Sequence, residues 1–253
     1  QDTVFNFDND PICNTPVSGC TNFYKVRINP SNTGNARFNS RFTLADNLTF
    51  TADASWQYVL ANGGGFTARA ENDISFKGSN PASPGVDFNK DGDFNDTIGF
   101  YTPNNTNTRR YTAIMSLIWD VTPEHRFRLA YTYDRARHRQ TGEWGLLDAT
   151  GAPENVFGGR NGTPVLASDG FQIQQRDRLS IALLNQVAGQ YIGKFFDEKL
   201  RVELGIRAPF FKRDLQNFCY TQTGGSGFAT CTSQFVGTVP VPATGGQIYI
   251  VPN

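Results

Sequence analysis

Residues 87–96 come closest to a metal-binding motif in this sequence. Oxygen-bearing side chains alternate along the segment, and Gly92 stands where a calcium loop makes its sharp turn. The candidate ligands, at positions one, three, five, seven and nine of such a loop, are Asp87, Asn89, Asp91, Asp93 and Asn95. Position twelve, where a bidentate glutamate is expected, is Ile98. Asp96 or a carboxylate from another loop would have to complete the shell. Ca²⁺ is therefore the candidate cofactor, and the alternative is a solvated Asn/Asp loop without an ion.

The four cysteines form two local pairs, Cys13 with Cys20 and Cys219 with Cys231. Four cysteines permit three connectivities, and the nearest-neighbour pairing closes small loops. Disulfides suit a protein that folds in an oxidising compartment. A zinc site is the alternative, but the spacings are long and no histidine lies nearby. We expect two disulfides.

Little in the sequence could support enzyme catalysis. His125 falls beside a predicted turn and His138 near the opposite end of the same predicted strand, so they cannot share a triad or a metal site. The glycines at 63–65 are followed by no Lys-Ser/Thr pair and no βαβ unit, so they form no phosphate loop. No spacing of carboxylates singles out a glycosidase pair. We expect a protein that is not an enzyme.

The strands that would position these residues are predicted from the alternation of apolar and polar residues along the sequence. A strand with lipid on one side and water on the other alternates apolar and polar residues. From Leu48 to Leu60 the even positions are apolar or aromatic and the odd positions are mostly polar, over a length that exceeds the 9–11 residues of a membrane-spanning strand. Residues 37–44, 126–134 and 200–207 repeat the pattern. Residues 111–119 and 179–191 repeat it less cleanly, because the polar side carries Ile114, Ile118, Ala182 and Leu184.

Short and long connections alternate between these segments. The short ones are centred on Asp46, Pro123 and Asp197, whereas residues 61–108, 140–170 and those after Pro209 form long stretches. Outer-membrane barrels have short periplasmic turns and long extracellular loops. We therefore predict an all-β fold, with about six long strands in three hairpins forming part of a transmembrane antiparallel β-barrel. The alternative is a soluble antiparallel β-protein with one wet face.

Composition narrows the classes further. The chain has 253 residues, with 23 basic and 23 acidic side chains, so its charge gives no reason to expect nucleic acid as a partner. No apolar run approaches the roughly 18 residues of a membrane helix. The first residues lack the features of a signal peptide, so we expect that one has been removed or that the chain starts inside a longer precursor.

Several segments resemble the barrel of TonB-dependent outer-membrane receptors, of the type found in sphingomonad-like proteobacteria. They read TRRY at 108–111, YTYDRARHRQTGEW at 131–144, QRDRLS at 175–180, GIRAPFFKR at 205–213 and CY at 219–220. Members of that family have a plug domain inside a barrel of about 22 strands, together with an N-terminal TonB box. Neither plug nor box is present here, and six strands cannot close a barrel of even about eight. The resemblance thus implies that residues 1–253 are a portion of such a barrel.

The same resemblance implies residence in the bacterial outer membrane and energised uptake of a scarce nutrient, such as a siderophore, vitamin or glycan. The implied partners are outer-membrane lipid, the rest of the barrel and its plug, TonB through the missing N-terminal part, and a small nutrient ligand. Trp144 and the loop at 158–160 are plausible ligand contacts. A passive porin or structural barrel is the first alternative function, and a soluble calcium-binding adhesin module is the second.

Four arginines extend the lipid-facing parity beyond the aromatic residues. Counting along the strands places Arg109, Arg135, Arg137 and Arg139 outward, just above Tyr111, Tyr131 and Tyr133. Outward cations above an aromatic girdle would meet lipopolysaccharide phosphates, which arginine binds well. The alternative is a generic charged rim, should a bulge break the parity.

Overall fold

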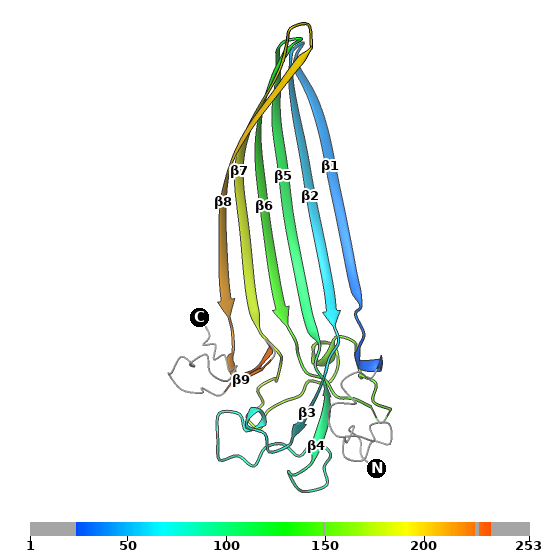
Figure 1. Ribbon diagram of the computed structural model, residues 1–253. Helices are drawn as coiled ribbons and strands as arrows, with labels where there is room; N and C mark the ends of the chain where they lie inside the picture. The colour runs from blue at the N-terminus through cyan, green and yellow to red at the C-terminus, as the bar shows by residue number, and fades with distance from the viewer. Residues whose placement is uncertain (1–23, 149, 226–227, 234–253) are drawn as a thin grey trace.

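Six long antiparallel strands dominate the computed structural model, which describes residues 24–148, 150–225 and 228–233 (Figure 1). They form one sheet in the order β1-β2-β5-β6-β7-β8. Their bounds are β1 Ser31–Ala45, β2 Leu48–Gly63, β5 Asn104–Thr122, β6 His125–Thr141, β7 Arg178–Phe195 and β8 Leu200–Asn217. The predicted all-β fold with three long hairpins is confirmed.

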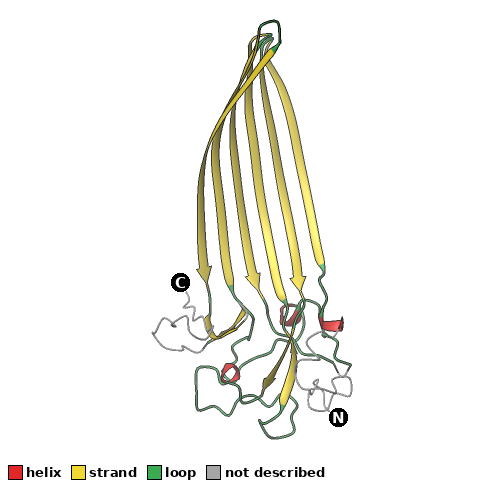
Figure 2. Cartoon of the chain, viewed as in Figure 1, coloured by secondary structure: helices red, strands yellow, loops and turns green. Residues whose placement is uncertain are grey.

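Short turns and long connections lie at opposite ends of the sheet (Figure 2). The turns at 46–47, 123–124 and 196–199 close the three hairpins at one end. At the other end lie the connections that carry the short strands β3 Phe66–Ala70, β4 Thr97–Tyr101, β9 Tyr220–Gly225 and β10 Phe228–Thr232. Any chemistry of the long connections is therefore concentrated at one end of the molecule.

The pairing register gathers the apolar positions of all six strands on one face. Cross-strand partners share a face of a sheet. One row of partners runs Phe42, Phe50, Leu117, Leu129, Gly189 and Ile206, and another runs Phe38, Ala54, Ala113, Tyr133, Asn185 and Phe210. Many of these side chains are exposed, among them Ile206 at 78% and Phe38 at 66%. No other part of the described chain covers this apolar face.

The opposite face is polar and carries its own ion pairs. Arg110 pairs with Asp134 at 2.5 Å, Arg126 pairs with Asp120 at 2.5 Å, and Arg37 pairs with Asp53. The same face holds the apolar residues that interrupt the sequence pattern, which are Ile114, Ile118, Ala182 and Leu184. The sheet thus has one apolar and one largely polar surface, as the alternation predicts.

The strands are longer than the alternating pattern indicates. The expectation that the last strand stops near Pro209 is wrong, because β8 continues to Asn217 and Pro209 pairs with Gln186. Proline lacks an N–H group, so Pro209 donates no hydrogen bond of its own to the sheet. At the other boundary β5 begins at Asn104, well before the residues at which alternation becomes visible.

Beyond the sheet, residues 64–103, 142–148 and 150–177 pack together into what we call the loop cap. β3 pairs with β4, and short 3₁₀ helices occur at Ile74–Phe76 and Gly158–Arg160, while a third, Tyr24–Val26, precedes β1. The main hydrophobic core of the loop cap consists of Phe76, Ile98, Phe100, Trp144, Val165, Ala167 and Ile173. The rings of Phe76 and Phe100 lie 5.4 Å apart, and those of Phe100 and Trp144 lie 5.6 Å apart. These long connections are thus a packed unit and not extended loops.

The six-stranded sheet does not close on itself within the described residues, where β1 and β8 stand at its two edges. A closed barrel is therefore not a feature of this structure. Among the residues described, no helix is both long and apolar enough to cross a membrane.

Candidate functional site

The predicted calcium loop folds into a tight turn of its own. Both carboxylate oxygens of Asp87 accept backbone N–H groups, from Lys90 at 2.5 Å and from Gly92 at 3.0 Å. Gly92 has φ +101°, a conformation that favours glycine. Further along, Asp91 Oδ1 accepts from Asp93 N and Asp93 Oδ1 accepts from Asn95 N. The acidic side chains thus hold the loop backbone in a series of local turns.

Glu71, which no sequence motif indicates, completes this cluster. One carboxylate oxygen from each of Glu71, Asp93 and Asp96 lies within 4.8 Å of the other two. Glu71 is wholly buried, and its Oε1 accepts the N–H groups of Phe88 at 2.6 Å and Asn89 at 3.3 Å. Its Oε2 is buried without a hydrogen-bond partner among the described residues.

The backbone of Glu71 is held on both sides. Its N–H donates to Asp96 O at 3.0 Å, and its carbonyl accepts from Val86 N at 3.1 Å. Gly85, with φ +122°, approaches so closely that a Cβ there would lie 2.0 Å from Glu71 O. The position of the carboxylate is therefore set by the loop cap and not by a flexible chain.

The electrostatics of the cluster favour a positive partner. Burial raises the pKa of Glu71, opposed by the two backbone N–H groups, and the charges of Asp87 and Asp96 raise it further. The pKa of Asp96 is also raised, chiefly by its hydrogen-bonded contact with Asp91. Asn89 Nδ2 bridges Asp91 at 3.1 Å and Asp96 at 2.6 Å. The cluster thus brings several carboxylates close together, and their negative charges favour a cation.

Of the sequence-predicted ligands, Asp93 lies in the cluster, and Asp87 and Asp91 border it. Asn89 contacts the cluster through its amide, whose oxygen accepts from Asp91 N at 3.2 Å. Asn95 donates its backbone N–H to Asp93 Oδ1 at 2.8 Å. Ile98, at the twelfth position, is fully buried in the loop-cap core. Glu71 reaches the loop because β3 pairs with β4 and sets Ala70 opposite Thr97.

The predicted outward arginines lie on the apolar face, as the register shows. Arg109 is the cross-strand partner of Tyr58 and Arg137, and Arg135 is the partner of Tyr111. Arg109, Arg135 and Arg137 form no ion pair with any described residue. Like charges directly opposite each other are destabilising without a counter-ion. These three side chains, which we call the arginine triad, are suited to an anionic partner.

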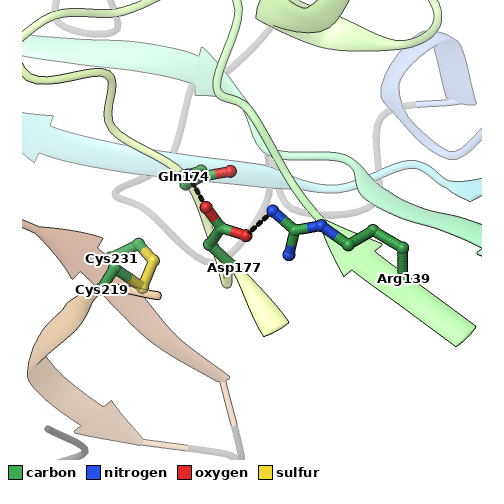
Figure 3. The surroundings of a disulfide bond; sticks show 5 residues. All are labelled: Arg139, Gln174, Asp177, Cys219 and Cys231. Carbon is green, nitrogen blue, oxygen red and sulfur yellow. Dashed lines mark hydrogen bonds and ion pairs between the residues drawn. A yellow bond between two sulfur atoms is a disulfide. The ribbon is translucent and has the colours of Figure 1, made fainter. Parts of the chain in front are cut away.

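Arg139 differs from the other three because it has a partner within the protein (Figure 3). It forms an ion pair with Asp177 and lies over the ring of Phe218, 4.7 Å from its centroid. Gln174 Nε2 also reaches Asp177, at 3.3 Å. Arg139 therefore connects the end of β6 to the segment before β7 and to the segment after β8. These contacts within the protein do not support the expected role of Arg139 as a contact to lipopolysaccharide.

The disulfide lies beside this ion pair (Figure 3). Cys219 and Cys231 are bonded, with their Cα atoms 5.4 Å apart, and Cys231 N donates to Gln174 O at 2.6 Å. The disulfide closes the β9–β10 hairpin, and the hydrogen bond from Cys231 joins this hairpin to the segment that precedes β7. Cys13 and Cys20, the other predicted pair, lie outside the described residues.

The suggested ligand contacts differ in exposure. Trp144 is 2% exposed and belongs to the loop-cap core, so its suggested role is wrong. In the loop at 158–160, Gly158 and Gly159 are buried and Arg160 is exposed, so a ligand contact there stays a prediction. His125 contacts Tyr191 Oη at 2.9 Å near the short turns, whereas His138 contacts Thr108 Oγ1 at 2.7 Å near the other end of β6. The two histidines do not share a site.

Comparisons of the chain with protein-family models, with curated proteins and with solved structures find no match.

Proposed function

We propose that this chain forms part of a bacterial outer-membrane β-barrel, within a receptor for TonB-energised uptake of a scarce nutrient. The observation that carries the membrane part is the uncovered apolar face, which continues across all six strands. Leu204, Ile206 and Phe210 of β8 alone are 62–78% exposed. Soluble monomers rarely expose contiguous apolar patches beyond a few hundred Å². Lipid chains are the solvent in which such a face is stable.

The extent of the apolar face fits a bilayer. On β2 it runs from Leu48 to Tyr58, whose row also holds Arg109 and Arg137, and on β8 from Leu200 to Phe210, one row before the row of Arg135 and Lys212. A spanning strand needs about 9–11 residues. The remaining residues of each strand would then project above the membrane on the side of the loop cap, which is the extracellular side in barrels of this kind.

The edges of the sheet favour a larger assembly. The outer sides of β1 and β8 present unpaired backbone N–H and C=O groups among the described residues. Lipid does not tolerate such groups without partners. The proposal therefore includes further strands that pair with β1 and β8, with the polar face lining the interior of the complete barrel.

The transport part of the proposal is supported by the receptor-like segments. They occur along β5, β6, β7 and β8, and they imply a plug and TonB as partners and a small nutrient as ligand. A passive porin is the second candidate, favoured by the polar face with its ion pairs. The acidic cluster would also suit a calcium-binding adhesin. A soluble module, however, rarely exposes an apolar face of this extent.

The arginine triad adds a lipid contact to the proposal. On the apolar face Arg135 lies one row beyond Tyr133, in the row of Trp56, and Arg109 and Arg137 lie one row further. Guanidinium groups bind phosphate through paired hydrogen bonds. At that height on the outer side they would meet lipopolysaccharide phosphates.

Opposite faces of β6 provide a matched test. Leu129 is 57% exposed on the apolar face, whereas Thr132 lies on the polar face near Asp134. We expect Leu129→Arg to lower the stability in the membrane by about 2–4 kcal/mol and Thr132→Arg to be tolerated, because an arginine near the bilayer midplane is costly. Folded protein in outer-membrane fractions is measured by heat-modifiable gel mobility. Equal assembly of the two variants would contradict the proposal.

A further inference from the structure

The buried carboxylate of Glu71 is the feature of the loop cap that most needs a partner. Its Oε2 has neither solvent nor a hydrogen-bond donor among the described residues, although Oε1 accepts two N–H groups. Burying a carboxylate oxygen without compensation is costly. One carboxylate oxygen of Glu71 also lies within 4.8 Å of an oxygen of Asp93 and of Asp96, and like charges at such distances repel one another.

A bound cation would compensate the charge of these carboxylates, and the types of ligand atom indicate which cation it is. The clustered side chains offer only carboxylate oxygens, with no histidine or cysteine. Hard oxygen ligands select calcium or magnesium over transition metals. Calcium ligands lie at about 2.3–2.6 Å from the ion, so two ligands on opposite sides are about 5 Å apart, whereas magnesium ligands on opposite sides are about 4 Å apart. Magnesium usually keeps several waters and is held by one or two carboxylates, so a cluster of three protein carboxylates favours calcium.

We propose that the loop cap binds one calcium ion between Glu71, Asp93 and Asp96, with Asp87 and Asp91 at the border of the site. Glu71 then supplies the carboxylate that the twelfth position of the loop lacks. That position, Ile98, is committed to the hydrophobic core. Glu71 can take this role because β3 pairs with β4, which brings Glu71, directly after β3, beside Asp96, directly before β4.

The ion would have a structural consequence for the cap. Residues 87–96 contact the rest of the cap at two places: the ring of Phe88 packs on Phe76 and Phe100, and Glu71 bonds to the backbone of Phe88, Asn89 and Asp96. A bound ion would link the carboxylate of Glu71 to those of Asp93 and Asp96 through its own coordination bonds. We therefore expect calcium to order this loop, and Lys90, which is exposed at its tip, provides a cleavage site for trypsin that reports the ordering.

The test measures calcium binding to the intact protein in detergent by titration calorimetry, together with the rate of tryptic cleavage after Lys90. Extracellular calcium sites have dissociation constants of about 0.1–1 mM. We expect one such site, with slower cleavage at Lys90 when calcium is present. Glu71→Gln keeps the shape and the accepting oxygen but removes the charge. It should weaken binding at least tenfold and abolish the protection.

Glu154→Gln is the matched control, because Glu154 is a loop-cap carboxylate that accepts only from Thr163. It should retain both calcium binding and protection. Asp93→Asn serves as the second variant, since Asp93 is exposed and an amide can still accept from Asn95 N. The proposal is overturned if calcium at 10 mM gives no heat, if Glu71→Gln and Asp93→Asn bind as tightly as the unaltered protein, or if magnesium binds equally well.

Discussion

Tyr101 shows how a single residue joins the loop cap to the sheet. Its ring is fully buried beside Val26 and Leu147. Its hydroxyl donates to Val156 O at 3.0 Å and accepts from Asn62 Nδ2 at 3.0 Å. Asn62 lies at the end of β2, so this hydroxyl connects a long strand to both connections of the cap. Burial raises the pKa of Tyr101 to about 12, partly opposed by the Asn62 hydrogen bond.

This shift predicts a specific dependence on alkaline pH. The folded protein keeps the phenol neutral up to about 12, while an unfolded chain ionises near 10. Because the pKa of Tyr101 is higher in the folded protein, the buried neutral phenol contributes fully to the free energy of unfolding below about pH 10. This contribution is lost as the pH rises toward about 12. The phenolate absorbance of the intact protein minus that of Tyr101→Phe should titrate near 12. A difference that titrates near 10 would show that Tyr101 is not buried.

Single residues also mark the limit of what the sequence predicts. The loop at 87–96 is visible as a motif because its ligands are neighbours in the chain. Glu71 is not, because only the pairing of β3 with β4 brings it to the loop. Trp144 shows the reverse error: an aromatic residue in a long connection looks like a ligand contact until Phe76 and Phe100 are found packed on it.

At the scale of the element, alternation predicts the long strands well and their ends poorly. The pattern is set by the contrast between two faces, and it fades where both faces become polar. The extensions of β5 before Tyr111 and of β8 beyond Pro209 therefore carry little signal, although both remain paired. The packing of the two long connections into one core is equally hidden, because their apolar residues follow neither period of a regular element.

The arginine triad yields a prediction at this scale, because three neighbouring positions on β5 and β6 act together. Replacing Arg109, Arg135 and Arg137 by glutamine should reduce the lipopolysaccharide that co-purifies with the protein and sensitise cells to bile salts. The reason is the loss of paired hydrogen bonds to phosphate. The lipid is measured by phosphate and sugar analysis of the detergent-purified protein.

A triple replacement on the polar face is the control. Arg37, Arg110 and Arg126 each have a carboxylate partner there, so changing them to glutamine should leave lipopolysaccharide unaffected. If both triple variants retain the same amount of lipopolysaccharide as the unaltered protein, the lipid contact of the arginine triad is refuted.

At the scale of the whole molecule, the two faces of the sheet constrain membrane residence more than they constrain transport. The apolar face meets lipid in a porin and in a receptor alike. The polar face, with Arg110 and Asp134 among its ion pairs, would line the interior in both. What separates the two functions is the content of the barrel, because a plug closes the lumen of a receptor and a porin leaves it open.

Ion conductance therefore tests the transport proposal directly. The complete protein, reconstituted into planar bilayers in potassium chloride, should show no steady open current, because a plugged lumen admits no continuous column of water. An open porin in the same bilayers is the positive control for conductance. Steady ohmic channels formed by this protein would contradict the receptor proposal and support the porin. The bilayer position of the apolar face is common to both outcomes, so the Leu129→Arg and Thr132→Arg comparison remains an independent measurement of membrane residence.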